Sequence, residues 1–299
     1  MTRRHHMDRL LRITGAWPYL IAIFLNAFVD LGHKIVIQNT IFKSYDGTAQ
    51  VVLTALVNGL ILLPFILLFS PAGHVADSYP KVRILRTSAW AAVVVSLGIT
   101  VAYYQGWFWL AFAMTLLLAI QSAFYSPAKY GLVKGLFGKA RLAEANGLIQ
   151  AVTIGAILAG TVAFTALFET RVSSNEQTPA QLLREIAPLG WLLVLNSTLQ
   201  VLTLSRLPLD NAAPSNTPLT WQRYLTGSAL KDNLRIIAHQ PVIRLSIIGL
   251  ATFWSVGQVL LAAFPAYAKE ALSIDNTLVL QAILAASGIG IALGSLLAS

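Results

Sequence analysis

The sequence predicts an all-α membrane protein, and three observations lead to this fold class. The 299 residues are 56% hydrophobic and only 11% charged, and their mean hydropathy is +0.68. In soluble globular proteins, roughly a quarter of the residues are charged. A chain with so few charged and so many apolar residues requires a bilayer around it. The apolar residues form long continuous runs without the alternation of barrel strands. A cytosolic enzyme, a nucleic-acid-binding domain and a disordered chain are excluded, and the lack of cysteine excludes disulfides and thiol chemistry.

Eight segments are long and apolar enough to cross a membrane as helices of about 20 residues. In chain order they cover residues 17–42, 49–70, 84–104, 107–128, 142–168, 188–204, 242–268 and 277–299. The first segment is not a signal peptide, because it is too long, contains Asp30 and Lys34, and lacks a small-residue cleavage site.

The uneven distribution of Lys and Arg predicts how the chain is oriented. If the N-terminus is cytoplasmic, 16 of these residues lie in inside segments, and Lys34 lies within a span. Only 4 lie outside, namely Lys43, Arg171, Arg184 and Lys269. This follows the positive-inside rule, which accounts for the net charge of +9 without a nucleic-acid partner. We therefore expect a multi-pass protein of the bacterial inner membrane with a cytoplasmic N-terminus.

A long cytoplasmic connection after the sixth span divides the chain. We expect a cytoplasmic tail at 1–16, a six-helix half at 17–204, an inter-half loop at 205–241 and the first two helices of a second half at 242–299. Apolar residues of the loop recur at helical spacing with basic residues between them, which indicates a helix on the membrane surface or a soluble connector helix.

Six spans before a long loop are typical of transporters built from two six-helix halves. A weak repeat supports this layout, because Phe28 and Gly32 recur as Phe253 and Gly257 at the same relative place in the second half. The sequence therefore predicts eight helices of an expected twelve, with about four helices missing from a fragment or natural truncation.

The first span carries a polar stripe. Asn26, Asp30, Lys34 and Gln38 recur every four residues and share one helical face, with His33 beside Lys34. Asp30 and Lys34 lie near mid-membrane, where each charge would cost at least about 2.5–3.5 kcal/mol against lipid. They must face a cavity, the protein interior or each other. We interpret the stripe as part of a substrate path, and the alternative is a structural Asp30–Lys34 pair.

The link between the second and third spans contains Gly73, Asp77, Lys81 and Arg83. This order resembles the cytoplasmic signature of the major facilitator superfamily, although Pro80 stands where that family usually has Gly. Gly73 would permit close helix approach, and Asp77 could cap a helix and pair with a basic residue to latch one conformation. The alternative is an ordinary charged loop.

Further polar residues follow in the fourth and fifth spans. Gln121, Tyr125 and Lys129 lie four residues apart on one face, and Asn146 and Gln150 open the next span. We expect these five residues to bind substrate together with Asn26, Asp30, His33 and Lys34. Lys129 could instead serve only the positive-inside bias.

The segments 125–131, 144–147 and 153–160 closely resemble the bacterial lysophospholipid transporter family, a branch of the major facilitator superfamily. The resemblance covers essentially the whole chain and is strongest over residues 120–160. It implies a major-facilitator-type helical bundle that moves lysophospholipids, mainly lysophosphatidylethanolamine, from the outer to the inner leaflet of the inner membrane for reacylation. No enzymatic activity, cofactor or metal is expected.

Some relatives in that family are fused to an acyltransferase, sometimes followed by an acyl-carrier-protein ligase. His33, Lys34 and the long connection 169–187 resemble this fused form, although no His-x-x-x-x-Asp motif occurs in residues 1–299. Asp30 would bind the ethanolamine ammonium, and Lys34 or Lys129 the phosphate. Two alternatives stay open: a proton-coupled transporter of a small polar solute, with Asp30 or His33 carrying the proton, and the membrane part of a bifunctional transporter–acyltransferase.

Overall fold

The computed structural model describes residues 10–173, 178–208, 226–228, 231, 234–235 and 238–286, and the statements below concern these residues. Their secondary structure is helical. The elements are α2 (Ala16–Ser44), α3 (Gly47–Leu67), α4 (Phe69–Ser78), α5 (Lys81–Gln105), α6 (Phe108–Phe137), the 3-10 turn η1 (Lys139–Arg141), α7 (Leu142–Glu169), α8 (Pro179–Glu185), α9 (Leu189–Ser205) and α12 (Pro241–Leu272). A short apolar helix, Thr277–Ala286, follows α12.

Six of these helices are long and apolar enough to cross a membrane, and α8 with α9 forms a seventh candidate that is bent by 60°. Two predicted spans have different bounds. The second one is broken at Leu68 into α3 and α4, and the fourth continues through Pro127 to Phe137. The segment predicted at 277–299 is described only as far as Ala286, and most of the predicted loop helix lies outside the described residues.

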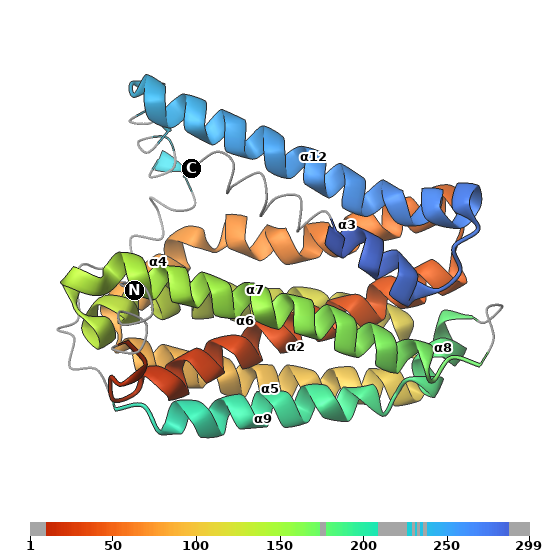
Figure 1. Cartoon of the computed structure of the whole chain (residues 1–299), viewed down its shortest axis with the longest axis horizontal. Coiled ribbons are helices and arrows are strands. Elements are labelled where there is room, and N and C mark those ends of the chain that lie inside the picture. Colours follow the sequence, from red (N-terminus) through yellow and green to blue (C-terminus); the bar gives the residue numbers. More distant parts are fainter. Residues whose placement is uncertain are drawn as a thin grey trace, which may run out of the picture.

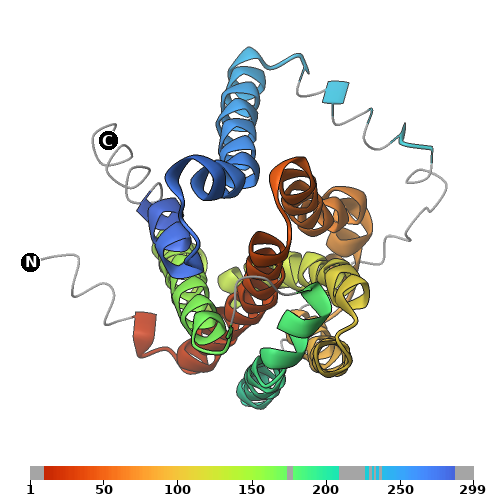
Figure 2. The same ribbon diagram turned by 90° about the vertical axis from the view of Figure 1, so that its right-hand side faces the viewer.

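The helices run lengthwise as a bundle with α2 near its middle (Figures 1 and 2). α2 packs along α7 on one side and α9 on another, α5 lies between α6 and α9, and α3 lies beside α6. α12 contacts mainly α3 and lies to one side of the other helices. This arrangement leaves a first group, α2 to α9, with its own core, and a second group that begins with α12.

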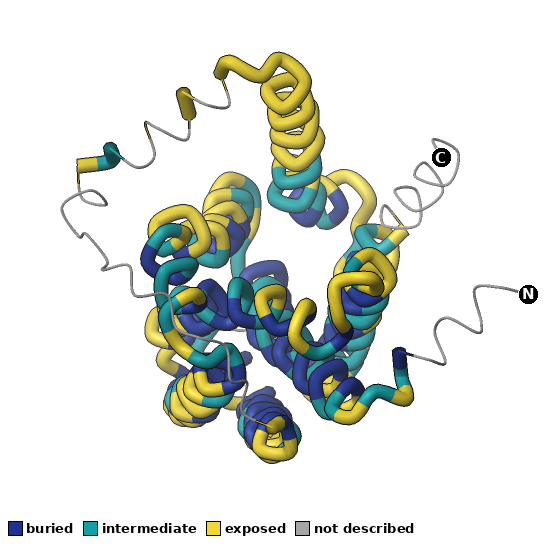
Figure 3. Tube along the Cα trace, turned by 90° about the vertical axis from the view of Figure 1, so that its left-hand side faces the viewer, coloured by how far each residue is buried: buried dark blue, intermediate teal, exposed yellow. Residues whose placement is uncertain are grey.

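The outward faces of the bundle are apolar, and Figure 3 shows their exposed residues around a buried centre. Trp90, Val94, Trp109, Leu195 and Leu202 are all more than half exposed. Side chains of this kind are stable on the outside only if hydrocarbon surrounds them. The protein is therefore an all-α, multi-pass membrane protein.

Two apolar clusters fill the first helix group, one at each end of α2. Tyr19, Leu20 and Ile23 belong to the cluster near the start of α2, and the other cluster begins at Val29. Asn26, Asp30 and their polar partners occupy the layer between the two clusters. The apolar ends of the bundle thus enclose a polar layer near the middle of α2.

Candidate substrate site

The polar centre is built around Asn26 of α2. Its side-chain amide donates to Asp30 Oδ2 at 3.1 Å and to Ser122 Oγ at 3.2 Å. Its carbonyl oxygen accepts from Gln121 Nε2 at 3.2 Å and from Gln200 Nε2 at 3.1 Å. An amide side chain can make four hydrogen bonds of this kind, so Asn26 is fully used in joining α2, α6 and α9.

Asp30 is held by only one of its two oxygens. Oδ2 accepts from Asn26 and from the Ser122 hydroxyl, whereas the buried Oδ1 has no hydrogen-bond donor among the described residues. A buried carboxylate oxygen without a donor is costly, and it can accept a hydrogen bond from a ligand. We call Asn26, Asp30, Gln121, Ser122 and Gln200 the Asp30 cluster.

Sequence reasoning did not place Ser122 and Gln200 in the site. Gln200 is fully buried in α9, and the nearby Asn196 donates to the Leu25 carbonyl of α2 at 2.7 Å. The available signal was the presence of polar side chains within an apolar span, which are expensive and usually face the bundle interior. The sequence does not show which other span these side chains face.

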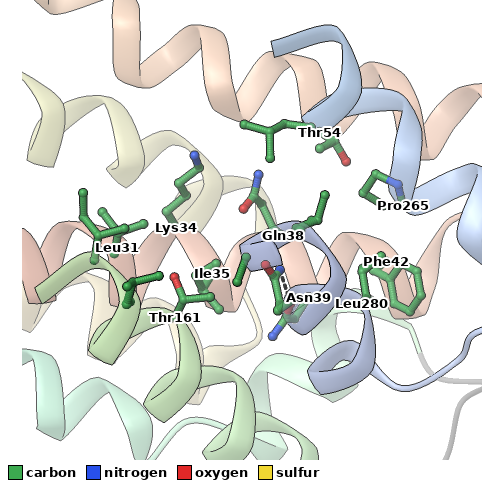
Figure 4. Close-up of a pocket in the computed structure, with 16 residues that line it drawn as sticks. Leu31, Lys34, Ile35, Gln38, Asn39, Phe42, Thr54, Thr161, Pro265 and Leu280 are labelled. Atoms are coloured by element: carbon green, nitrogen blue, oxygen red, sulfur yellow. Dashed lines mark hydrogen bonds between the residues drawn. The ribbon is translucent and has the colours of Figure 1, made fainter. Parts of the chain in front are cut away.

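A cavity of about 220 Å³ lies one helical turn further along α2, between the first helix group and the second. Lys34, Gln38 and Asn39 of α2 contribute polar groups to it (Figure 4). The remaining lining is mostly apolar and comes from α2 itself, α3, α7, α12 and the helix Thr277–Ala286. Gln281 donates to the Asn39 side-chain oxygen at 3.4 Å, so the two helix groups meet at the cavity wall.

Lys34 has no hydrogen-bond or ion-pair partner in the described part of the chain. The alternative of a structural Asp30–Lys34 pair is therefore wrong for this conformation. In Figure 4 the side chains of Lys34 and Gln38 extend from α2 to the same side. The half-buried Lys34 side chain lines the cavity.

His33 is separated from this cavity by the orientation of its ring. It is fully buried, with Nδ1 2.8 Å from the Tyr103 hydroxyl and Nε2 3.0 Å from the Ala111 carbonyl oxygen. The Thr115 hydroxyl also lies 3.2 Å from Nε2. His33 thus joins α2 to α5 and α6, and the structure does not bring it into the cavity lining with Lys34.

Lys129 lies near the Asp30 cluster. Its ammonium interacts electrostatically with Asp30, without an ion pair within the described residues, and lies 4.6 Å from the centre of the Tyr130 ring. Its backbone carbonyl accepts a hydrogen bond from Tyr19 at 2.5 Å. Tyr125 is buried one turn away. The structure therefore gathers Gln121, Tyr125 and Lys129 at the Asp30 side of the site.

Asn146 and Gln150 do not join this group. Both are exposed on α7, and Gln150 donates to the Tyr130 hydroxyl at 3.3 Å. The predicted latch residues are also dispersed. Asp77 is exposed without a partner among the described residues, while Lys81 packs over Gly131 of α6.

The other two predicted latch residues are Arg83 and Gly73. Arg83 lines a mostly apolar groove of about 420 Å³ between α4, α5 and α6. Gly73 has open space where a side chain would project, so the expected close helix approach at Gly73 is wrong in this structure. No group of three His, Cys, Asp or Glu that could hold a metal is found in the part of the chain described.

Curated relatives match this chain over most of its length. A lysophospholipid transporter LplT of Enterobacter sp. strain 638 is 27% identical over 99% of this chain and 68% of its own length. The transporter of the same name from Serratia proteamaculans is 27% identical over 79% of this chain and 52% of its own length. One from Salmonella heidelberg is 33% identical over 53% of this chain and 37% of its own length.

This chain thus spans about two thirds of the Enterobacter relative and about half of the Serratia relative. No family model and no solved structure matches it. The relatives are named as transporters and not as enzymes, in agreement with the prediction of a protein without enzymatic activity. The comparisons agree with the resemblance seen in the sequence: over nearly its whole length, this chain is similar to lysophospholipid transporters named LplT.

Proposed function

We propose that this chain is the N-terminal part of a twelve-helix transporter of lysophospholipids in the bacterial inner membrane. The names of its relatives, its apolar outer surface and the polar site at the centre of its bundle support this proposal. The proposed domains are those expected from the sequence: a tail at 1–16, a half at 17–204, a loop at 205–241 and the start of a second half at 242–299. The N-terminus faces the cytoplasm in this proposal.

The observation that carries the proposal is the ammonium of Lys34 in the cavity between the two helix groups, where none of the described residues pairs with it. An unpaired cation at mid-membrane depth costs about 2.5–3.5 kcal/mol, and a helix under selection for stability alone would use an apolar residue there. A phosphate is the anion that a lysophospholipid would bring to it. Lys129 is the second proposed phosphate ligand, closer to the cytoplasmic end.

The head group of lysophosphatidylethanolamine also carries an ammonium two carbons from its phosphate. Asp30 lies one helical turn from Lys34, where side chains are about 5–6 Å apart, and its Oδ1 is free to accept from that ammonium. The apolar walls that α7 and α12 contribute to the cavity would contact the acyl chain. A zwitterionic head group with a single chain fits both parts of the site.

Transport from the outer to the inner leaflet would deliver the lipid to a cytoplasmic acyltransferase, as a separate partner or a fused domain. Rocking of the two halves would carry the head group across. The proposed latch, Gly73, Asp77, Lys81 and Arg83, lies at the cytoplasmic end and would close that side in the opposite conformation.

A ligand-dependent thermal shift of the purified full-length protein tests this proposal. Lysophosphatidylethanolamine should raise the unfolding temperature of the wild type, and glycerophosphoethanolamine, which lacks the acyl chain, should raise it much less. Lys34→Gln should lose the shift, Lys34→Arg should keep part of it, and the exposed Lys134→Gln serves as a control for charge. Equal shifts with both ligands would instead favour a carrier of small polar solutes.

A further inference from the structure

The two helix groups are joined at one end of the bundle by charged side chains. This end holds Lys43 and Lys269, which are two of the four cations expected outside. We infer that Lys43, Asp46, Glu169 and Lys269 form an outer gate, which closes the central cavity toward the outside in the conformation described here.

The first part of the outer gate is a buried ion pair that holds the second helix group. Lys43 Nζ lies 3.3 Å from Glu169 Oε1, and both side chains belong to the first group. Lys43 also donates to the Asp275 carbonyl at 2.7 Å, and Glu169 accepts from the Thr277 backbone N–H at 2.5 Å. The pair therefore binds the connection between α12 and the helix Thr277–Ala286.

In the second part of the outer gate, the lysine comes from the second helix group and the carboxylate from the first. Lys269 of α12 lies 2.6 Å from Asp46 Oδ1, which belongs to the first group. Its ammonium also donates to the carbonyl oxygens of Phe42, at 3.0 Å, and Tyr45, at 3.4 Å. A cation is favourable at this place, because the last carbonyls of α2 carry the negative end of the helix dipole.

An apolar layer lies beneath these charges. Phe42, Ala268 and Leu280 are buried together in one cluster that spans both groups. Phe42 and Leu280 also line the cavity. The outer gate therefore consists of a polar cap, an apolar layer and then the cavity. Thirteen residues separate Lys43 from Asp30 along α2, which places the gate about 20 Å from the Asp30 cluster.

The opposite end of the second group is not joined in this way. The buried residues of α12 are Pro265, Ala266 and Ala268, all near the gate, and residues 241–256 are exposed in the described structure. In Figure 1, α12 approaches the other helices at the end where α8 lies and stands away from them at the opposite end. Asp77, at the proposed cytoplasmic end, has no partner there within the ranges that the structure describes. In the inferred cycle, a substrate that arrives from outside enters the cavity after the outer gate opens.

The composition of the gate suits a contact that must break in each cycle. Asp46 is largely exposed, and exposed ion pairs contribute at most about 1 kcal/mol, so the Lys269–Asp46 contact can be broken easily. The Lys43–Glu169 pair is more buried, and its loss would leave two charges without partners. The pair can stay intact while the gate opens, because only its contacts to Asp275 and Thr277 cross between the groups.

Cysteine accessibility tests the outer gate directly, because the 299 residues contain no native cysteine. Thr161→Cys adds a thiol to the cavity lining, and the protein without this substitution measures any labelling at cysteines outside residues 1–299. A membrane-impermeant maleimide, added to intact spheroplasts or to inside-out vesicles, then reports access from each side. With the gate intact, labelling should be slow from outside and fast from the cytoplasmic side.

Glu169→Gln and Lys269→Gln should each accelerate labelling from outside by about fivefold or more. Glu185→Gln and Arg184→Gln are matched controls, because Glu185 contacts Ser173 and Arg184 contacts the Gln105 carbonyl within the first group. These controls should label as slowly as the parent. Lys269→Asp should open the gate, and adding Asp46→Lys should restore slow labelling, which a misfolded variant would not do.

Two results would overturn the inference: outside labelling that is already fast in the parent, or gate variants that label no faster than Glu185→Gln and Arg184→Gln. The inference rests on the proposed transport function only for the orientation of the chain in the membrane and for the opening of the gate during transport. Labelling requires no lipid, so a failure of lysophospholipid binding would leave this result unaffected and the two failures distinguishable.

Discussion

Asn26 and Asp30 show how a charged side chain is kept in the interior of this bundle. Asn26 makes four hydrogen bonds to three helices and orients the carboxylate of Asp30, whose Oδ2 also contacts Ser122. Such a network is stable only when its polar atoms are satisfied. Among the described residues, Asp30 Oδ1, Gln200 Oε1 and the Tyr125 hydroxyl are exceptions at the centre of the site, and a ligand ammonium would satisfy the Asp30 oxygen.

Asp30→Asn should lower lysophospholipid uptake by about tenfold or more, because it removes the charge that would bind the ligand ammonium. An asparagine can keep the contacts to Asn26 and Ser122, so the protein should still insert and accumulate in the membrane. Uptake and membrane abundance measured in the same cells check this expectation. Wild-type uptake by a normally abundant variant would remove Asp30 from the site.

Substitutions of Lys129 distinguish two roles for this residue, which are binding phosphate and only fixing the orientation of the chain in the membrane. Lys129→Arg keeps a cation for both roles, although its planar head group binds phosphate with a different geometry. Lys129→Gln should insert correctly, because at least ten other inside cations are present, yet it should lose uptake far more than Lys129→Arg. The comparison is an uptake assay with matched expression. If the two variants transport equally well, Lys129 serves topology alone.

Most helices could be predicted from apolar run length, because a span needs a fixed number of residues. The break at Leu68 and the continuation of α6 through Pro127 could not, because apolar run length does not show whether a helix breaks or continues past a proline. The polar stripe on α2 was predicted as one face. His33 and Lys34 were not separated, because the partners of His33 come from α5 and α6, about 70 to 80 residues away.

The close packing of α5 and α9 depends on Gly190. A methyl group there would lie 2.7 Å from the Thr100 hydroxyl and 2.9 Å from its Cα, which is too close for either helix to stay in place. Gly190→Ala should therefore destabilise the protein by about 1–3 kcal/mol. Gly155→Ala, where the added methyl has open space, should be close to neutral. Thermal unfolding in detergent measures both, and equal unfolding temperatures would contradict this packing.

Asp77 lies near the end of α4, just before the link to α5, and its proposed role is to latch whole helices in one conformation. Asp77 is exposed in the present conformation, so we expect its pairing to form in the opposite one. Asp77→Ala should lower the maximal rate of transport without altering the preference among head groups, because it lies outside the cavity lining. Kinetics with two different head groups provide the test. An altered preference at an unchanged maximal rate would argue against a latch.

At the scale of the whole molecule, the two described helix groups meet at the proposed gate and not at the opposite end of α12. Two apolar clusters keep the first half together as one body, while α12 contributes buried residues only near the gate. This division is what rocking of one half against the other requires. The position of the long loop predicted two halves but not the contacts between the helix groups, because the hydrogen bonds of Lys43 and Lys269 and the ion pair across the gate join residues more than 200 positions apart.

Uptake of labelled lysophosphatidylethanolamine is the most direct test of the proposed function. Spheroplasts that express the complete gene should take up this lipid in a saturable manner, well above cells with an empty vector. Lys34→Gln should abolish most of this uptake, Lys134→Gln should not, and excess glycerophosphoethanolamine should compete weakly. Uptake no greater than in the empty-vector cells, with the protein present in the membrane at normal abundance, would contradict the assignment of this chain as a lysophospholipid transporter.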